Sequence, residues 1–510
     1  MSDTNWLEEP TRLSQSVLWD LQRRFYESTG KDAWAEEIVP TQVSTNAYMA
    51  EAYAAMLLEW AESLNVENQE PIYIVEIGAG SGRLGARVAG ALRRRRVEGS
   101  PRLIYVLTDL AERNIEFWNE HPVMKELVAD GLVDFARLDL EDDAPIVLQH
   151  SGVTLAPGSQ PNPIGIVGNY IVDTVRQDLF RVRDGRIFEV LVRAKGPDSD
   201  ATDVVNKVTL SFDEVPIRDD YYSEPELNDL LKTYGTTLTD SNVLVPIGLL
   251  RNLRRLCAIG GQRALFISGD KALRHLHEWQ GTRRPHLATH GSISVMANFH
   301  AVGHLFDSMG GSTWHARSST TRFTISAFLL DDDPALRSRC RRAFVDWLDD
   351  FGPSDFHRLY KLLRKIDLPD LTWLLLLVRL SSYDPRTLLR LAGQFRKILS
   401  DAPKDLKRDT GDMLEEVWLR RYRVSSNEDL SFQLARLYTR LGRYDDGLRF
   451  YRVSLGEDGP HRAVFHNMGL CLERLNRLDE AAVMLEKALE IDPDYELAKQ
   501  RLARVKKKLE

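Results

Sequence analysis

The chain has 510 residues, 43% of them hydrophobic and 28% charged, and its formal net charge is -8. A chain of this length is too long for one hydrophobic core, so we expect two or three domains. The negative charge gives no overall attraction to nucleic acid, although a local basic patch could still bind one. The three cysteines, Cys257, Cys340 and Cys471, lie far apart and form no CxxC pair, as is typical in a reducing compartment.

The ends and the apolar runs of the chain bear on its location. The amino terminus, MSDTNWLEEP, has neither a basic nor an apolar segment, so we do not expect a secretory signal. The strongest apolar run, Trp373 to Val378, is far shorter than the ~20 residues that cross a bilayer. We therefore expect a cytoplasmic protein that does not enter a membrane.

The first two thirds of the chain predict an α/β domain. Residues 1–66 are helical in pattern, with helices expected over 13–27 and from Ser44 or Asn46 onward. From 67 to 330, strands alternate with helices, which predicts a Rossmann-like, mostly parallel sheet with helices on both faces. The expected strands are IYIVE, RLIYVLTDL, VDFARLDL, IGIVGNYIVD and RALFISGD, followed by a terminal β-hairpin over 313–330.

Two segments interrupt this alternation. FRVRDGRIFEVLVRAK has a turn at Asp184-Gly185 and predicts a β-hairpin. NKVTLSFDEVPI, which follows a polar loop, is a further expected strand. We predict that the two segments form an inserted β lobe near the carboxyl edge of the sheet.

The last third of the chain is helical and ends in a repeat. Residues 442–447 match 476–481 at an offset of 34, which is the period of tetratricopeptide repeats. Since solenoids need about three repeats and only two are clear at 425–510, the connecting helices over 331–424 are expected to complete the stack. We expect this all-α module to hold a protein substrate or partner. The second copy has suitable residues at Phe465, Gly469, Leu472, Ala481, Leu485, Ala488 and Pro493.

A glycine-rich loop, VEIGAGSG at 75–82, lies between a strand and a helix. Glycines allow positive φ and close approach of a ligand, and the N–H groups of the following helix can hold an anion. A dinucleotide fingerprint would need a glycine where Arg83 stands. The spacing ExGxGxG is instead typical of methyltransferases that use S-adenosylmethionine, with the methionine carboxylate as the anion. We predict that this cofactor is bound by Glu76, Gly78, Ala79, Gly80 and Gly82.

Acids also follow the next two strands. Asp109 ends the second strand, where a carboxylate can accept both ribose hydroxyls. Asp139 follows the third strand, within expected reach of the adenine amino group. We predict that both acids, with Leu110 and Leu140, line the cofactor site. Alternatively, each acid simply caps the helix that follows it.

The fourth strand leads to candidate catalytic residues. Because ligands bind beyond the carboxyl ends of the strands, Asn169 and Asp173 are predicted to orient the methyl acceptor, and Asn169 also to contact the cofactor. The alternative is that Asn169 ends the strand and Asp173 caps a helix. His300 and His304 are four residues apart, but no third ligand accompanies them, so we predict no metal site.

Residues 71–330 resemble the MidA-like methyltransferases in IVEIGAGSGRLGARVAGAL, IGIVGNYIVDTVRQDLFRVRDGRIFEVLV and GSISVMANFHAVGHLFDSMGG. The resemblance implies N-methylation of arginine on a protein. In the family's Asn-Glu-x-x-Asp-Ala-x-Pro segment, Tyr170 replaces the glutamate and Arg176 the proline, so Asp173 or Asp178 would have to hold the guanidinium. Ser268-Gly269-Asp270 stands where the family has Asp-Tyr-Gly.

Two classes of function follow from these patterns. The first is a methyltransferase with S-adenosylmethionine as cofactor, whose repeats recruit a protein substrate or partner. The second is a repeat scaffold in which the α/β domain binds the cofactor without catalysis, as the replacements at Tyr170 and Ser268 suggest. A small-molecule acceptor is a third option, because a fold does not fix its substrate. The sequence leaves the oligomeric state open.

Overall fold

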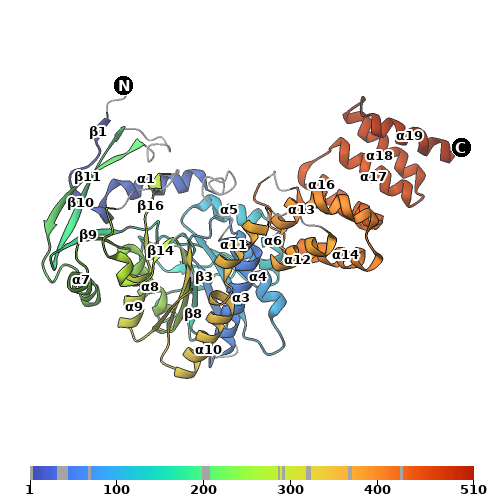
Figure 1. Cartoon of the computed structure of the whole chain (residues 1–510). Coiled ribbons are helices and arrows are strands. Elements are labelled where there is room, and N and C mark those ends of the chain that lie inside the picture. Colours follow the sequence, from blue (N-terminus) through green and yellow to red (C-terminus); the bar gives the residue numbers. More distant parts are fainter. Residues whose placement is uncertain are drawn as a thin grey trace. The chain divides into compact units, whose positions relative to one another are not determined.

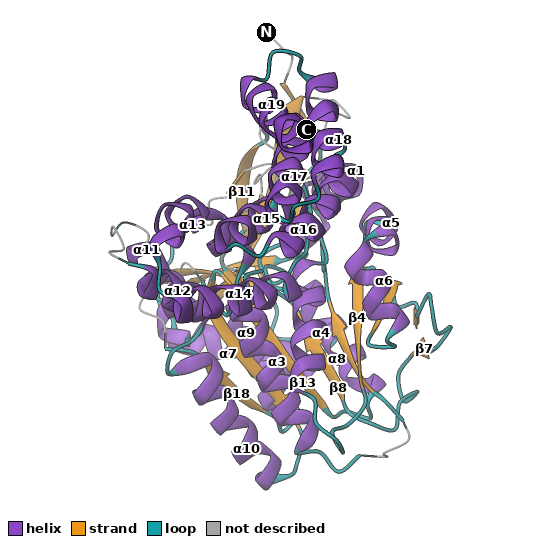
Figure 2. Ribbon diagram, turned by 90° about the vertical axis from the view of Figure 1, so that its right-hand side faces the viewer, coloured by secondary structure: helices purple, strands orange, loops and turns teal. Residues whose placement is uncertain are grey.

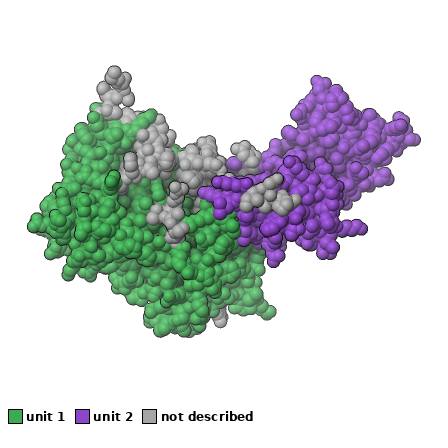
Figure 3. All heavy atoms as spheres, in the orientation of Figure 1, with its two compact units in different colours: residues 1–359 green, residues 360–510 purple. Residues whose placement is uncertain are grey.

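The structure is a computed structural model, and it describes residues 4–30, 44–66, 70–197, 207–284, 288–289, 293–317, 323–363, 365, 370–425 and 429–510. The chain divides into two compact units, residues 1–359 and 360–510 (Figures 1 and 3). In the described part of the chain, no helix is both long and apolar enough to cross a membrane.

The first unit is built on a seven-stranded sheet of order β18-β19-β13-β8-β3-β4-β5. The five strands from β13 to β5 are parallel, while β19 is antiparallel to both β13 and β18. The fold class predicted from the sequence is confirmed, including the terminal hairpin, whose turn lies outside the described residues. The strands are β3 (Ile72–Glu76), β4 (Leu103–Asp109), β5 (Val133–Arg137), β8 (Ile164–Val167), β13 (Ala264–Asp270), β18 (Ser312–His315) and β19 (Thr324–Leu330).

Helices cover both faces of this sheet (Figure 2). On one face, α3 (Ala47–Glu62) approaches the strands closely at Gly165, where an added Cβ would lie 3.0 Å from Ile74 and 3.4 Å from the Trp60 ring. On the other face, Val75 of β3 belongs to the same apolar core as Leu253 of α8 (Ile247–Ile259). Further helices of this unit are α1 (Val17–Thr29), α4 (Arg83–Arg95), α5 (Glu112–Glu120), α6 (Pro122–Ala129), α7 (Pro225–Thr237), α9 (Phe299–Ser308) and α10 (Pro334–Phe344).

The inserted lobe is a second, antiparallel sheet. The predicted hairpin turns at Asp184 and Gly185, whose φ angles of 52° and 73° match a two-residue hairpin turn. The predicted third strand pairs with the hairpin, and further strands that were not predicted complete the sheet. Its members are β1 (Thr4–Trp6), β2 (Thr11–Arg12), β9 (Asp178–Arg183), β10 (Arg186–Pro197), β11 (Thr209–Pro216) and β12 (Ser241–Val245).

The second unit is all-α, and its last helices form the two pairs expected of the repeats. Small residues allow the close packing within each pair, as at Gly469 of α17, where an added Cβ would lie 2.7 Å from Leu485 of α18. Helix α11 (Pro353–Leu363) spans the boundary between the units. The others are α12 (Leu371–Leu380), α13 (Pro385–Ile398), α14 (Lys404–Leu419), α15 (Leu430–Leu441), α16 (Tyr444–Asp458), α17 (Arg462–Arg474), α18 (Leu478–Ile491) and α19 (Glu496–Leu509).

The packing of the repeats can be tested with two glycines. We expect Gly469→Ala to lower the free energy of unfolding by about 1–3 kcal/mol, because the new methyl group overlaps Leu485. Gly456→Ala in α16 is the matched control, since nothing lies within 4 Å of its added Cβ, and it should raise stability by up to ~1 kcal/mol. Urea unfolding followed by circular dichroism measures both changes. Equal effects of the two substitutions would contradict the described packing.

Candidate active site

The glycine-rich loop connects β3 to α4. Gly78, Gly80 and Gly82 have φ angles of 64°, 55° and 72°, a region that side chains with a Cβ seldom enter. The Ala79 N–H donates to the Thr108 carbonyl at 2.9 Å and holds the loop against the end of β4. Gly78 is exposed and Ala79 half-buried, whereas Gly80 and Gly82 are buried. The loop therefore presents its first residues outward, where a ligand can reach the backbone.

Asp109 lies directly at this loop. Its Oδ2 accepts the Gly80 N–H at 2.8 Å, and its Oδ1 accepts the Ala111 N–H at 2.9 Å. Burial raises the pKa of Asp109, while these N–H groups oppose the rise. The structure thus brings Asp109 and the loop together, with the half-buried Leu110 beside them. The carboxylate also holds Ala111, the residue before α5, but no side chain caps this helix, so Asp109 does not act as the helix cap.

Glu76 lies beneath the loop. Its side chain points under α4, since a Cβ on Gly85 would lie 2.5 Å from its Oε2. This oxygen is buried without a hydrogen-bond partner, and the Tyr105 hydroxyl is beside it. Burial raises the pKa of Glu76 to about 8, and the charge of Asp109 adds to the rise. Glu76 is therefore largely protonated at neutral pH.

Glu76 should make the stability of the protein depend on pH. Its pKa of about 8 exceeds its ordinary value of 4.5, so the folded chain keeps a proton that the unfolded chain loses between these values. The carboxyl therefore destabilises the fold increasingly as the pH rises from 4.5 to about 8. Glu76→Gln removes this effect, and the variant should gain stability over the parent between about pH 6 and about pH 9 in urea unfolding. The exposed Glu120→Gln should show no such gain, and a pH-independent difference for Glu76→Gln would contradict the assignment.

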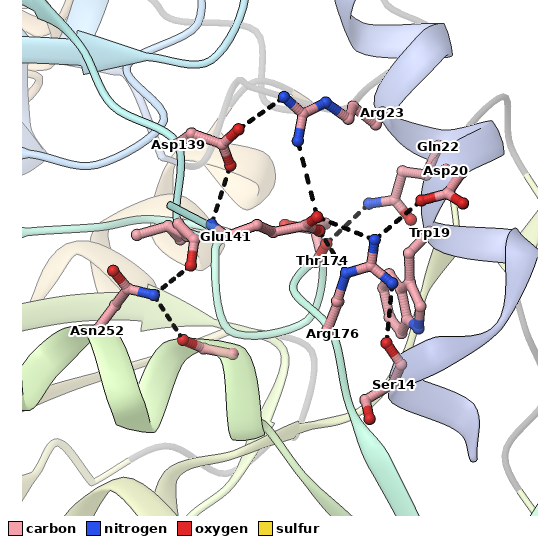
Figure 4. Close-up of polar contacts among 12 residues, drawn as sticks. Ser14, Trp19, Asp20, Gln22, Arg23, Asp139, Glu141, Thr174, Arg176 and Asn252 are labelled. Carbon is pink, nitrogen blue, oxygen red and sulfur yellow. Dashed lines mark hydrogen bonds and ion pairs between the residues drawn. The ribbon is translucent and has the colours of Figure 1, made fainter. Parts of the chain in front are cut away.

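Asp139 is engaged by the N-terminal helix α1 (Figure 4). Arg23 of α1 donates to its Oδ2 at 2.6 Å, and the Glu141 N–H donates to its Oδ1 at 2.9 Å. The carboxylate is thus paired with a cation of the chain itself, and it does not cap a helix. The carbonyl of the neighbouring Leu140 accepts a hydrogen bond from the Asn252 side chain.

Arg176 ties the same helix to the sheet (Figure 4). Its guanidinium binds both oxygens of Glu141, at 2.5 and 2.9 Å, and Asp20 of α1 at 2.9 Å. The Gln22 amide of α1 adds a bond to the Thr174 carbonyl at 2.9 Å. Arg176 therefore provides an anchor that places α1 beside the segments after β5 and β8.

Asn169 joins three elements at the carboxyl edge of the sheet. Its Oδ1 accepts the Tyr53 hydroxyl of α3 and the Gly269 N–H of β13, both at 2.8 Å. Its Nδ2 donates to the Ser44 carbonyl at 3.3 Å. The side chain is thus held by the protein on both its oxygen and its nitrogen. Sequence reasoning missed Tyr53, because a tyrosine within an alanine-rich helix carries no local sign of this contact.

Asp173 forms a buried acidic pair with Asp270. The Asp270 carboxylate accepts the N–H groups of Asp173 at 3.1 Å and of Lys271 at 2.6 Å. The Asp173 Oδ1 is buried and has no hydrogen-bond partner. Burial raises the pKa of both carboxyls, and the charge of Asp270 adds to the rise for Asp173. Asp270 was missed as a site residue, although it ends a strand just as Asp109 does.

The remaining candidates lie elsewhere or serve the fold. Asp178 accepts the Tyr222 hydroxyl at 2.7 Å within the inserted lobe, and does not join the acidic pair. His300 contacts the Tyr234 hydroxyl at 3.2 Å, and His304 the Glu226 carbonyl at 3.1 Å. Within the described ranges, no group of three or more His, Cys, Asp or Glu side chains could hold a metal ion.

Comparisons with known proteins find one matching family and several solved structures of similar fold. Residues 463–495 match the tetratricopeptide repeat family, which confirms the second predicted repeat. Two COG1565 superfamily proteins from Burkholderia thailandensis are similar in structure, and one of them, a likely methyl transferase, is bound to S-adenosyl-homocysteine. The sequence of that protein is 15% identical to this chain. The match covers 64% of this chain and 95% of that protein, with a TM-score of 0.37. The other is 13% identical, with 64% and 94% covered and a TM-score of 0.37.

A third similar structure is a tetratricopeptide repeat protein. It is YrrB, a tetratricopeptide protein with an unusual peptide-binding site, and its sequence is 18% identical to this chain. The match covers 32% of this chain and 72% of YrrB, with a TM-score of 0.18. A search of curated proteins finds no match to the sequence.

Proposed function

We propose that this chain is a methyltransferase that uses S-adenosylmethionine. The observation that carries the proposal is the glycine loop with Asp109 beside it. The exposed edge at Gly78 gives a ligand access to the backbone, and the N-terminus of α4 offers N–H groups to the methionine carboxylate. Asp109, at the end of β4, is suited to the ribose hydroxyls. When bound, the cofactor supplies a methyl group on a positively charged sulfur.

The acidic pair supports a cationic acceptor, and we propose arginine on a protein. Asp173 keeps a buried, unpartnered side-chain oxygen, and its backbone N–H donates to the Asp270 carboxylate. A guanidinium binds carboxylates through paired N–H bonds, and its charge would favour the ionised form of both acids. Asp173 and Asp270 would thus hold and orient the acceptor nitrogen, and such positioning supplies much of the rate of a displacement. Asn169, through Tyr53 and Gly269, would keep this edge of the site rigid.

The helical unit would recruit the acceptor protein. A substrate protein held by the helical unit has a higher effective concentration at the active site of the first unit, and this needs no additional contacts at the active site. Cys257, Cys340 and Cys471 form no disulfide with one another, which supports a role in a reducing cytoplasm.

Cofactor binding can be tested by titrating the full chain with S-adenosyl-homocysteine in a calorimeter. Asp109→Ala should weaken binding roughly 10–100-fold, because hydrogen bonds to a charged group contribute about 1.5–3 kcal/mol. Asp130→Ala, on an exposed carboxylate after α6, should leave the Kd unchanged. Thermal melts would show whether Asp109→Ala has also unfolded the loop region. Absence of binding by the parent protein would overturn the proposal.

Transfer can be tested with radiolabelled S-adenosylmethionine and arginine-containing proteins. Asp173→Asn should lower kcat/KM for the acceptor on the order of 10–100-fold, since the variant loses a charge-assisted contact, while S-adenosyl-homocysteine binding stays intact. Asp142→Asn, in an exposed loop of the same unit, is the control. Equal activity of parent and Asp173→Asn would refute the assigned role.

A second candidate function is a scaffold that binds the cofactor without turnover. Two observations favour it: Asn169 is engaged by the protein on both polar atoms, and Arg23 occupies Asp139. Under this alternative, the calorimeter detects S-adenosyl-homocysteine, but no labelled methyl group reaches any protein acceptor. The two experiments together therefore separate the candidates.

A further inference from the structure

Charge is distributed very unevenly over the helices of the second unit. Helices α13, α15, α17 and α19 together carry 14 lysines and arginines but only two acids, a net charge of +12. The intervening helices α14, α16 and α18 carry 6 lysines and arginines and 13 acids, a net charge of -7. Successive basic helices are neighbours, since α13 contacts α15, α15 contacts α17, and α17 contacts α19. These four helices therefore lie in one layer, which we call the basic layer.

In the first half of the basic layer, three arginines form no ion pair with a carboxylate among the residues that the structure describes. Arg396 of α13 donates to Gln433 of α15 at 2.6 Å. Burial lowers the pKa of Arg396, and the positive charges of Arg436 and Arg440 on α15 lower it further. Among the residues that the structure describes, no carboxylate forms an ion pair with any of these three arginines. The charge of Asp429, whose carboxylate accepts a hydrogen bond from Gln433, opposes these shifts but is the weakest of the influences on Arg396. The three like charges are thus only partly neutralised, which costs free energy unless a ligand compensates them.

The second half of the layer already holds a carboxylate. Glu473 of α17 is bound by Arg501 at 2.8 Å, Arg504 at 2.6 Å and Lys508 at 2.9 Å, all from α19. These cations lower the pKa of Glu473 to about 2 despite its burial. Three cations surround one acid, so positive charge remains in excess. The side chains of Arg504 and Lys508 are still 53% and 50% exposed, and each can accept a second anion.

The two halves are continuous. Thr439 of α15 and Cys471 of α17 are in contact at 3.3 Å and join the helices that carry the two groups of cations. Burial raises the pKa of the Tyr451 hydroxyl and of the Cys471 thiol, and the nearby charges of Arg436 and Arg501, respectively, oppose the rise. The charges of both halves therefore act on one contiguous region.

We propose that the basic layer is the docking surface for an acidic peptide segment of a partner protein. Glu473 demonstrates the recognition chemistry, because it is a carboxylate held by guanidinium and ammonium groups of this same layer. Half-buried Phe432 and Leu470, on α15 and α17, offer contacts for apolar side chains between the acids of the peptide. A peptide carboxylate at Arg436 and Arg440 would add to the partial counter-charge that Asp429 gives to this group of arginines.

Nucleic acid is the less favoured ligand. The net charge of the chain is -8, and the acidic helices α14, α16 and α18 would repel a long polyphosphate. A short peptide segment can contact the basic layer without approaching the acidic helices. The inference names the class of ligand for the recruiting unit of the proposed function, and it does not require that the first unit transfer methyl groups.

The experiment uses the full chain without cofactor and a fluorescein-labelled peptide of alternating aspartate and leucine. Fluorescence anisotropy should detect binding at ~0.1 M salt and a clear loss at ~1 M salt, where screening becomes short-ranged. The Arg436→Gln/Arg440→Gln double variant should raise the Kd about tenfold or more. Lys404→Gln/Arg408→Gln, which removes two exposed charges from α14, is the matched control and should leave the Kd unchanged.

Two further probes decide between ligand classes. A peptide of alternating lysine and leucine should not bind, and single-stranded RNA of similar length should bind more weakly than the acidic peptide. The inference is overturned if the acidic peptide does not bind, if RNA binds more tightly, or if the control variant weakens binding as much as the α15 variant. Circular dichroism confirms that both double variants are folded. Since no cofactor is added, failure here would leave the methyl-transfer tests of the first unit unaffected.

Discussion

One buried carboxylate holds the candidate site together. Asp109 sits at the end of β4 and accepts N–H groups from Gly80, in the loop after β3, and from Ala111, before α5. The parallel pairing of β3 and β4 brings the two strand ends to the same edge, and the Thr108 hydroxyl reinforces it by donating to the Glu76 carbonyl at 2.7 Å. Because the loop fixes the direction of α4, this single acid aligns the backbone groups on which anion binding depends.

The parts of the fold that could be predicted are those with a local signature. The glycine spacing, the strand periods of the sheet and the Asp184-Gly185 turn each depend on a few consecutive residues, and the structure contains all of them. Strands β1 and β2 have only three and two residues, too few to show a period, and form because β10 offers them a partner. The second repeat could be found because its small residues recur at a fixed spacing.

The sequence positions of the candidate site residues could be predicted, but the contacts that their side chains make could be predicted less well. A strand followed by an acid marks Asp109 and Asp139 in the sequence, and the same rule would have found Asp270. Whether such an acid faces a ligand or another side chain is decided by distant segments, as with Arg23, which lies 116 residues from Asp139. Tyr53 and Asn169 are likewise 116 residues apart, and no local pattern encodes their hydrogen bond.

The alternation of charge in the helical unit has a kinetic consequence. Because positive charge gathers on α13, α15, α17 and α19 and negative charge on α14, α16 and α18, charge is separated within the unit and gives it a dipole moment. In such a field, an approaching molecule with its own uneven charge experiences a torque as well as an attraction, so it is turned into register before any atoms touch. Productive encounters then make up a larger share of all collisions, and the rate of association exceeds what random tumbling would allow.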